Sequence, residues 1–261
     1  MTLDLVCRYF LLFFFCSMLG WLMEVTCKLF QFHRFINRGF LIGPYCPIYG
    51  FGAVLVTLLL SRYADSVAAV FVLAMVVCGT LEYLTSYMME KLFHARWWDY
   101  SQKKFNLNGR VCADTLIPFG LLGLGMIYFV KPLLFGWFSH LTDSWLYGLS
   151  WGLVILFLAD TVVSTCVLGK IRHAATMTSG DSTEAITKAV RESLARQSAL
   201  FRRQLHAFPD MKMYNRTLQQ RLKTRRAEAE ADMRARREKF RADIEAGEQR
   251  IKAEIKARKN K

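Results

Sequence analysis

The sequence predicts an all-α fold: a polytopic membrane bundle of five transmembrane helices, with its amino terminus outside and its carboxyl terminus inside, followed by a helical, coiled-coil-like cytoplasmic tail. Three observations predict it. The 261-residue chain is 53% hydrophobic and yet carries a formal net charge of +14. Its apolar residues gather in five long windows, and its basic residues gather toward the carboxyl end. We therefore expect a transmembrane bundle over residues 1–169 and a basic tail over residues 170–261.

The two parts differ sharply in charge. Residues 1–169 contain 11 Lys and Arg and 9 Asp and Glu, a net charge of +2. Residues 170–261 contain 24 and 12, a net charge of +12. This division is typical of a part that lies in a bilayer and a part that lies in water.

The apolar windows give the number and the orientation of the expected spans. A helix that crosses the hydrocarbon core needs roughly 20 mostly apolar residues. Five windows meet this requirement: about 5–30, 45–63, 66–93, 112–135 and 145–169. The loops after the first and third windows carry most of the basic residues: Lys28, Arg34, Arg38, Lys91, Arg96, Lys103, Lys104 and Arg110. The opposite loops carry only Arg62 and Lys131, so the basic loops and the tail are expected in the cytoplasm.

The stretch NRGFLIGPYCPIYGFG at residues 37–52 fits neither a polar loop nor a plain membrane helix. Its two prolines remove amide donors, and its four glycines lower helix stability. Irregular backbone at membrane depth persists only where protein buries it or where it lines a cavity. We therefore expect a broken or re-entrant cytoplasmic segment that helps to wall a polar pocket.

Four acidic residues lie inside the expected spans, one in each of four helices: Glu24, Glu82, Asp114 and Asp160. A charge near the bilayer centre costs on the order of 3 kcal/mol and usually faces the interior of the bundle. The rise of a helix puts all four on the cytoplasmic side of the midplane. Arg38 and Arg110 are the nearest cationic candidates to compensate them. The cluster is therefore either a set of structural ion pairs or the lining of a polar cavity for a substrate or an ion.

The two cytoplasmic loops also share a spacing pattern. Three residues recur at identical spacing: Asn37, Pro47 and Gly52 after the first span, and Asn108, Pro118 and Gly123 after the third. A parallel internal repeat of the kind that transporters use would explain them, and so would coincidence.

Aromatic residues of the second loop suit the membrane interface, where Trp97 and Trp98 would lie among the headgroups. Asp99, directly beside them, has no such explanation. With the acids, arginines and asparagines above, this gives seven candidate substrate-binding residues: Glu24, Asn37, Arg38, Glu82, Asp99, Asn108 and Arg110.

The motifs of several enzyme classes are absent from the sequence. All seven cysteines precede residue 170 and none forms a C-x-x-C pair, so neither a disulfide framework nor a cysteine zinc site is indicated. The chain has no Walker A motif, no H-E-x-x-H and no G-x-S-x-G. We therefore expect no metal or cofactor, and favour a protein without enzymatic activity of its own.

The tail is expected to form two helices, over about 182–207 and about 214–258. Apolar residues of the second recur every 11 residues in two rows: Leu218, Ala229, Phe240 and Ile251, and Leu222, Met233, Ile244 and Ile255. An 11-residue period gives one narrow stripe, which favours a straight or right-handed coiled coil. The stripe either pairs two chains as a homo-oligomer or docks on the first tail helix. Basic residues of the tail would attract anionic lipid, whereas the interleaved acids disfavour nucleic acid.

Several separated motifs resemble one family. They are Gly20, Trp21 and Glu24, NRGFLIGP at 37–44, PIYG at 47–50, LEY at 81–83, Glu90, WWDY at 97–100 and NLNGRVC at 106–112. These motifs, over about residues 10–130, resemble the bacterial membrane family labelled "putative ABC-transporter type IV (CmpB-like)". The resemblance implies a permease in the bacterial cell membrane, whose nucleotide-binding subunit would come from another chain. It implies no particular substrate or reaction.

Three functions follow from these expectations. The leading one is a transporter or permease component with a polar site on the cytoplasmic side of the bundle. The second is a membrane enzyme acting on a lipid or polyprenyl phosphate, with Arg38 and Arg110 as anion clamps and Glu24 or Asp99 as base. The third is a membrane scaffold that only holds partners together.

Overall fold

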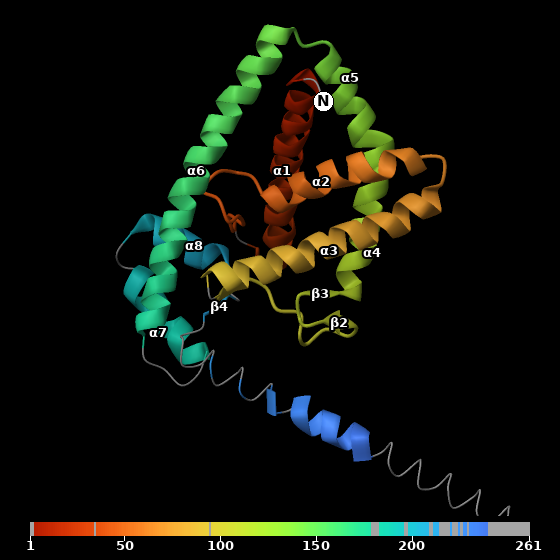
Figure 1. Cartoon of the computed structure of the whole chain (residues 1–261). Coiled ribbons are helices and arrows are strands. Elements are labelled where there is room, and N and C mark those ends of the chain that lie inside the picture. Colours follow the sequence, from red (N-terminus) through yellow and green to blue (C-terminus); the bar gives the residue numbers. More distant parts are fainter. Residues whose placement is uncertain are drawn as a thin grey trace, which may run out of the picture. The chain divides into compact units, whose positions relative to one another are not determined.

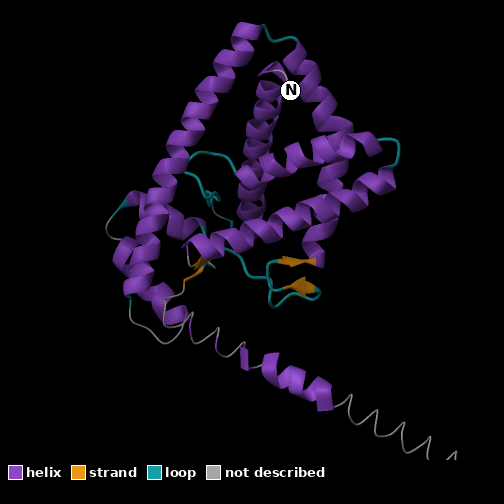
Figure 2. Ribbon diagram, viewed as in Figure 1, coloured by secondary structure: helices purple, strands orange, loops and turns teal. Residues whose placement is uncertain are grey.

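The structure is a computed structural model that describes residues 3–33, 35–93, 95–178, 183–195, 198–208 and 211–213, together with 220, 224, 227–228 and 230–239 of the tail. Over these residues the chain is almost entirely α-helical (Figure 2). It forms two compact units, Met1–Tyr214 and Asn215–Lys261. The boundary that the sequence suggested, between residues 169 and 170, instead lies inside a helix.

Within the described residues, four helical stretches are long and apolar enough to cross a membrane. They are α1 (Leu3–Phe32), α3 (Val67–Phe93), the continuous stretch Ala113–Ser139, and α6 (Asp143–Met177). Each coincides with one of the predicted spans. The remaining window forms α2 (Pro47–Leu60) and the short 3-10 helix η1 (Ser61–Tyr63). This apolar stretch has fewer residues than a hydrocarbon core of about 30 Å requires, so a fifth span stays a prediction.

The stretch Ala113–Ser139 changes its helical winding near a proline. It consists of α4 (Ala113–Gly125), the π-helical turn η2 (Met126–Val130) and α5 (Lys131–Ser139). Pro132 follows at the start of α5, where its ring would crowd the carbonyl group of the preceding helical turn. The wider π-turn lies at that place and accommodates the ring.

Small residues let the helices of the bundle approach closely. In Figure 1, α2 and α3 run side by side and cross α1. A methyl group on Gly50 of α2 would overlap Phe13 and Ser17 of α1, and one on Gly123 of α4 would overlap Ala74 of α3. Close backbone approach of this kind is typical of packing between membrane helices. The apolar core that results includes Leu12, Val56, Leu60, Val70 and Leu146.

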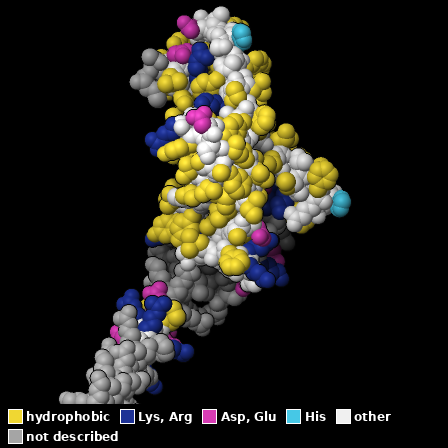
Figure 3. All heavy atoms as spheres, turned by 90° about the vertical axis from the view of Figure 1, so that its right-hand side faces the viewer, with side chains coloured by type: hydrophobic (Ala, Val, Ile, Leu, Met, Phe, Trp, Pro, Cys, Tyr) yellow, Lys and Arg dark blue, Asp and Glu magenta, His cyan; other side chains and the backbone are white. Residues whose placement is uncertain are grey.

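The outside of the helices is apolar as well. Phe129 and Trp145, for example, are 73% and 72% exposed. Figure 3 shows hydrophobic side chains over most of one face of the helices. A water-soluble domain rarely exposes so large an apolar surface, whereas lipid tails would cover it.

The tail begins with two short helices where the sequence predicted one. The expected helix over 182–207 is divided into α7 (Thr183–Ala195) and α8 (Ala199–Ala207). Ser198 is extended, and its side chain accepts a hydrogen bond from the amide of Leu200, so it caps α8 instead of continuing α7. The expected helix over 214–258 lies largely outside the described residues. Met233 is the member of its apolar stripe that the structure describes, and it is 59% exposed.

Four two-residue strands complete the fold. Strand β1 (Ala95–Arg96) pairs antiparallel with β4 (Lys212–Met213), and β2 (Asn106–Leu107) pairs with β3 (Val111–Cys112). The first pair joins the start of the tail to the loop after α3. We call residues 183–195, 198–208 and 211–213 the cap, and residues 95–112 the hairpin loop.

Candidate functional site

The chain between α1 and α2 folds back along α1. We call residues 35–46 the fold-back segment. The amide of Cys46 donates to the carbonyl of Ser17, near the middle of α1, at 2.9 Å. The segment therefore reaches about half-way along α1 before Pro47 begins α2.

Asp160 of α6 holds the backbone of the fold-back segment. Its carboxylate accepts hydrogen bonds from the amides of Ile42 (2.9 Å) and Gly43 (2.7 Å) and from the hydroxyls of Tyr45 (2.5 Å) and Ser164 (2.8 Å). Four donors on one carboxylate satisfy its lone pairs without a cation. Asp160 thus organises the segment and is not free to bind a ligand.

Glu24 of α1 lies where α2 begins. The hydroxyl of Tyr49 donates to its Oε1 at 2.7 Å, and Nε of Arg38 lies 4.0 Å from its Oε2. The ring of Tyr49 fits against α1 because Gly20 has no side chain there. Beside this group, Nε1 of Trp21 donates to Oδ1 of Asn37 at 2.7 Å.

Glu82 of α3 is 7% exposed, and its hydrogen-bond donors among the described residues are hydroxyl groups. Tyr100 and Thr115 donate to its two carboxylate oxygens, both at 3.3 Å. Among the described residues, no Lys, Arg or His forms an ion pair with it. It is a buried carboxylate without a compensating cation.

The two carboxylates belong to one polar cluster. Burial, the charge of Glu82 and the hydrogen bond to it, and the charge of Glu24 all raise the pKa of Tyr100, so this hydroxyl stays protonated and able to donate. We call Glu24, Tyr49, Glu82 and Tyr100 the carboxylate–tyrosine cluster. It joins α1, α2, α3 and the hairpin loop.

The two arginines of the hairpin loop share Glu90 of α3. Oε2 of Glu90 lies 3.1 Å from Nε of Arg96 and 2.9 Å from Nη2 of Arg110. Arg110 also donates to Oγ of Ser86 at 3.3 Å and lies over the ring of Tyr87. The two arginines are 8% and 7% exposed. This buried network fixes the hairpin loop to α3.

A tight turn lets the hairpin loop fold on itself. Asn108 and Gly109 both have positive φ angles (54° and 67°), and the amide of Arg110 donates to the carbonyl of Leu107 at 3.0 Å. These are the features of a type I′ turn, for which Asn-Gly is the favoured sequence. A side chain on Gly109 would also overlap Ser101 and Asp99.

Asp99 joins the hairpin loop to the cap. Its Oδ1 lies 3.4 Å from Nη1 of Arg96, and its Oδ2 lies 2.7 Å from Nζ of Lys212. Burial raises the pKa of Asp99, but the hydrogen bonds from Lys212 and Ser101 outweigh burial and leave the pKa below its usual range. Asp99 is therefore ionised at neutral pH.

The structure distributes the seven predicted site residues over three groups. Glu24, Asn37 and Arg38 lie at the fold-back segment. Glu82 lies next to them in the carboxylate–tyrosine cluster. The other three lie on the hairpin loop: Asp99 and Arg110 in the ion-pair network, and Asn108 with its side chain donating to Tyr83 at 2.9 Å.

Two expected positions differ from the structure. Arg110 forms its ion pair with Glu90 and not with Glu82. Asp114 lies at the start of α4 with its side chain 65% exposed, where it pairs with Lys103 at 3.0 Å. It is therefore outside the carboxylate–tyrosine cluster.

Sequence reasoning missed the partners that complete the site. Tyr49 and Tyr100 occur in the PIYG and WWDY motifs, but neither was chosen as a site residue. An intramembrane carboxylate needs donors, and a tyrosine at the end of a neighbouring span was the available signal.

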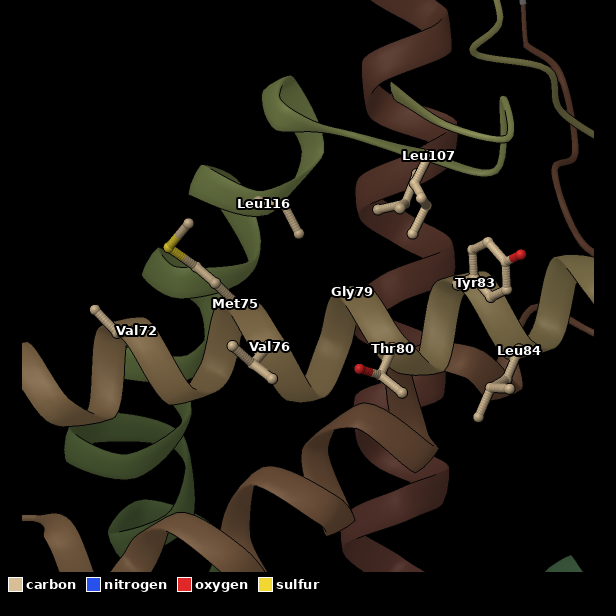
Figure 4. A pocket seen from close by; sticks show the side chains of 10 residues that line it. Val72, Met75, Val76, Gly79, Thr80, Tyr83, Leu84, Leu107 and Leu116 are labelled. Carbon is tan, nitrogen blue, oxygen red and sulfur yellow. The ribbon is translucent and has the colours of Figure 1, made fainter. Parts of the chain in front are cut away.

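An apolar pocket of about 380 Å³ lies beside the hairpin loop, between α3 and α4 (Figure 4). Gly79 leaves room at its centre, with Leu116 and Leu107 on the opposite side, and Tyr83 stands at one end. None of the seven predicted residues lines it. Its chemistry suits an acyl chain and not a polar solute.

The described residues offer no candidate metal centre, because no three His, Cys, Asp or Glu side chains among them converge. All seven cysteines are free thiols. Nothing in this part of the chain is arranged to hold a metal ion.

Apolar helices of membrane-spanning length, an apolar exterior and carboxylates inside the bundle define a multi-pass membrane protein. More particularly, the chain belongs to the family described as "Putative ABC-transporter type IV", whose model matches residues 11–165. This confirms the family that the motifs indicated. No curated protein and no solved structure is significantly similar to the chain.

Proposed function

We propose that the chain is a membrane-embedded component of a transporter, and that the carboxylate–tyrosine cluster is its polar site. Family membership supports the transport role. The observation that carries the site is Glu82, a buried carboxylate whose partners are the hydroxyls of Tyr100 and Thr115. An intramembrane carboxylate without a cation is costly to keep, and such residues usually serve function.

The contrast with Glu90 favours a binding role for Glu82 over a purely structural one. Glu90 is matched by two arginines, as a structural ion pair requires. Glu82 lies on the same helix without such a partner among the described residues. A cationic group of a substrate or a proton would provide the missing charge.

The remaining parts of the proposal concern orientation and partners. The basic loops favour an external amino terminus and a cytoplasmic tail, which puts the cluster on the cytoplasmic side. The sequence has no ATPase motif, so ATP hydrolysis would come from a separate nucleotide-binding subunit. The enzyme alternative has less support, because Arg110, one of its two anion clamps, is bound to Glu90 and Ser86.

Neutralising Glu82 tests the proposal without a known substrate. If Glu82 is a binding residue, Glu82→Gln should leave thermal stability unchanged or raise it, by up to about 3 kcal/mol, because a buried uncompensated charge disappears. The same variant should lose the melting-temperature shift that a stabilising solute, found by screening the wild-type protein, produces. Melting of the full chain in detergent measures both effects.

Glu184→Gln, on an exposed face of α7, is the matched control and should keep both properties. A large loss of stability in Glu82→Gln would favour the structural reading. An undiminished ligand shift would exclude Glu82 from the site.

A further inference from the structure

The contact between the cap and the fold-back segment contains buried polar atoms without partners. Helix α8 of the cap lies against the segment. Nη2 of Arg203 donates to the carbonyl of Leu41 at 2.5 Å, and Nε2 of Gln204 donates to the carbonyl of Phe40 at 2.6 Å. The other two guanidinium nitrogens of Arg203, Nε and Nη1, are buried and have no hydrogen-bond partner among the described residues. Nε of Arg38 is also buried and has no hydrogen-bond partner among the described residues.

Buried donors of charged groups rarely remain unpaired, because each loses its hydration without compensation. The indole nitrogen of Trp97 is a fourth buried donor of this kind, and Oε1 of Gln204 is a buried acceptor without a partner. Both residues also belong to the contact between the cap and its surroundings, since Trp97 packs against Phe208. Donors thus outnumber acceptors here, which favours a ligand rich in acceptor oxygens.

The two arginines lie close to one place in the fold. Arg203 donates to the carbonyl of Leu41, which follows Arg38 by three residues on the fold-back segment. Arg38 lies on this segment with its guanidinium over the ring of Phe208 at 5.7 Å, and Arg203 reaches the segment from α8. Two cations from two separate elements therefore lie at the contact between the fold-back segment and the cap.

The neighbouring carboxylates do not take up these donors. Asp160 already accepts four hydrogen bonds, none of them from Arg203. Glu24 accepts from Tyr49 and lies 4.0 Å from Nε of Arg38, beyond hydrogen-bonding distance. Both carboxylates reduce the local positive charge, but they leave these three arginine nitrogens without a hydrogen bond among the described residues.

We infer that Arg38 and Arg203 bind a phosphate monoester or inorganic phosphate at the contact between the fold-back segment and the cap. The planar guanidinium fork matches the oxygen geometry of phosphate, and two arginines suit a dianion. The site adjoins the carboxylate–tyrosine cluster, because Nε of Arg38 lies 4.0 Å from Oε2 of Glu24, but it does not depend on a transport function. Because one arginine comes from each side, the ligand stabilises the docked cap.

The test uses the full chain in nanodiscs of phosphatidylcholine. In one arm inorganic phosphate is titrated against chloride at constant ionic strength, and in the other the nanodiscs contain phosphatidic acid. We expect a saturable rise in melting temperature in at least one arm. A response to phosphate alone identifies the free anion, and a response to phosphatidic acid alone identifies a lipid headgroup.

Variants on the two elements make the test specific. Arg38→Gln and Arg203→Gln should each weaken the effect at least about tenfold, since each removes charged hydrogen bonds to the ligand. Arg202→Gln, the exposed neighbour on α8, should keep wild-type affinity within about twofold.

Arg203→Lys keeps a charge without the planar fork and should bind with intermediate affinity; it also serves if Arg203→Gln does not fold. A wild-type protein that responds in neither arm overturns the inference. So does a response that persists unchanged in both glutamine variants.

Discussion

The fold-back segment and the hairpin loop occupy corresponding places in the chain, yet they are held in opposite ways. Each follows a helix with a carboxylate in the carboxylate–tyrosine cluster, Glu24 on α1 and Glu82 on α3. In each loop an asparagine contacts an aromatic residue of the preceding helix: Asn37 with Trp21 and Asn108 with Tyr83. The two asparagines thus have similar partners, and an internal repeat stays a hypothesis.

The difference lies in where the stabilising partners come from. The hairpin loop carries its own turn, and its arginines pair with Glu90 on the helix that it follows. The fold-back segment has few internal hydrogen bonds and depends on Asp160 of α6 and on α8 of the cap. The hairpin loop is therefore held mostly by nearby residues, with β4 and Lys212 of the cap as distant partners, whereas the fold-back segment is held mostly by distant parts of the chain.

The largest expected effect comes from neutralising the carboxylate that anchors the hairpin loop to α3. Glu90→Gln leaves Arg96 and Arg110 buried without a carboxylate between them, and we expect a loss of about 3 kcal/mol, toward the lower end for a buried pair because Glu90 is a quarter exposed. Thermal or denaturant unfolding of the full chain in micelles measures it. Glu192→Gln, at an exposed position of α7, should change stability by less than about 0.5 kcal/mol. Equal stability of the two variants would mean that the arginines do not need Glu90.

An intermediate effect is expected from neutralising the carboxylate that holds the fold-back segment. Asp160→Asn replaces one acceptor oxygen by a donor and should cost about 2 kcal/mol, mostly as local opening. Cys46 lies in this segment and reports the opening: we expect its alkylation rate to rise at least about tenfold, measured on its own peptide by mass spectrometry. The exposed Cys27 provides an internal reference. Asp143→Asn, at the exposed start of α6, should leave the rate at Cys46 unaltered, and an unaltered rate in Asp160→Asn would show that Asp160 does not hold the segment.

The smallest effect concerns the link between the hairpin loop and the cap. Lys212→Ala should cost up to about 1 kcal/mol, because the lysine is half exposed. The pKa of Asp99 is lowered in the folded chain, so its contribution is present above the unfolded pKa of about 3.9 and is lost as the pH falls through the lower folded value. Cap docking, followed by limited proteolysis of the tail, should thus stay constant between pH 8 and pH 5 and weaken only below about pH 4. Release of the cap near pH 6 would contradict this assignment.

Hydropathy was enough to locate four of the five predicted spans, because bilayer thickness acts directly on the length of an apolar helix. Windows 66–93 and 145–169 correspond to Val67–Phe93 and Asp143–Met177. Helix α6 extends past residue 169, the end of its apolar window, because adding residues to an existing helix is easier than starting a new one. The same helix runs through the expected boundary between residues 169 and 170, and the division into bundle and tail stays a prediction.

Side-chain pairing was beyond the reach of sequence reasoning. Glu82 and Glu90 lie about two turns apart on α3, and their spacing alone does not indicate which of them meets Arg110. The tyrosines that hold Glu24 and Glu82 depend on how closely helices pack, as at Gly20. The cap, in turn, depends on strand pairing between residues far apart in the chain, which local patterns do not encode.

The dependence of the fold-back segment on distant residues has a consequence for biosynthesis. Asp160 follows Ile42 by 118 residues, and Arg203 follows Leu41 by 162, whereas Arg96 follows Glu90 by only 6. At roughly 5 to 20 residues per second, the ribosome delivers these late partners about 6 to 30 s after the segment itself. During that interval the amides of the segment need water or the insertion machinery as temporary partners. The first helical hairpin to be made is therefore the last to be finished, and a chain whose translation stops before α8 would leave it open.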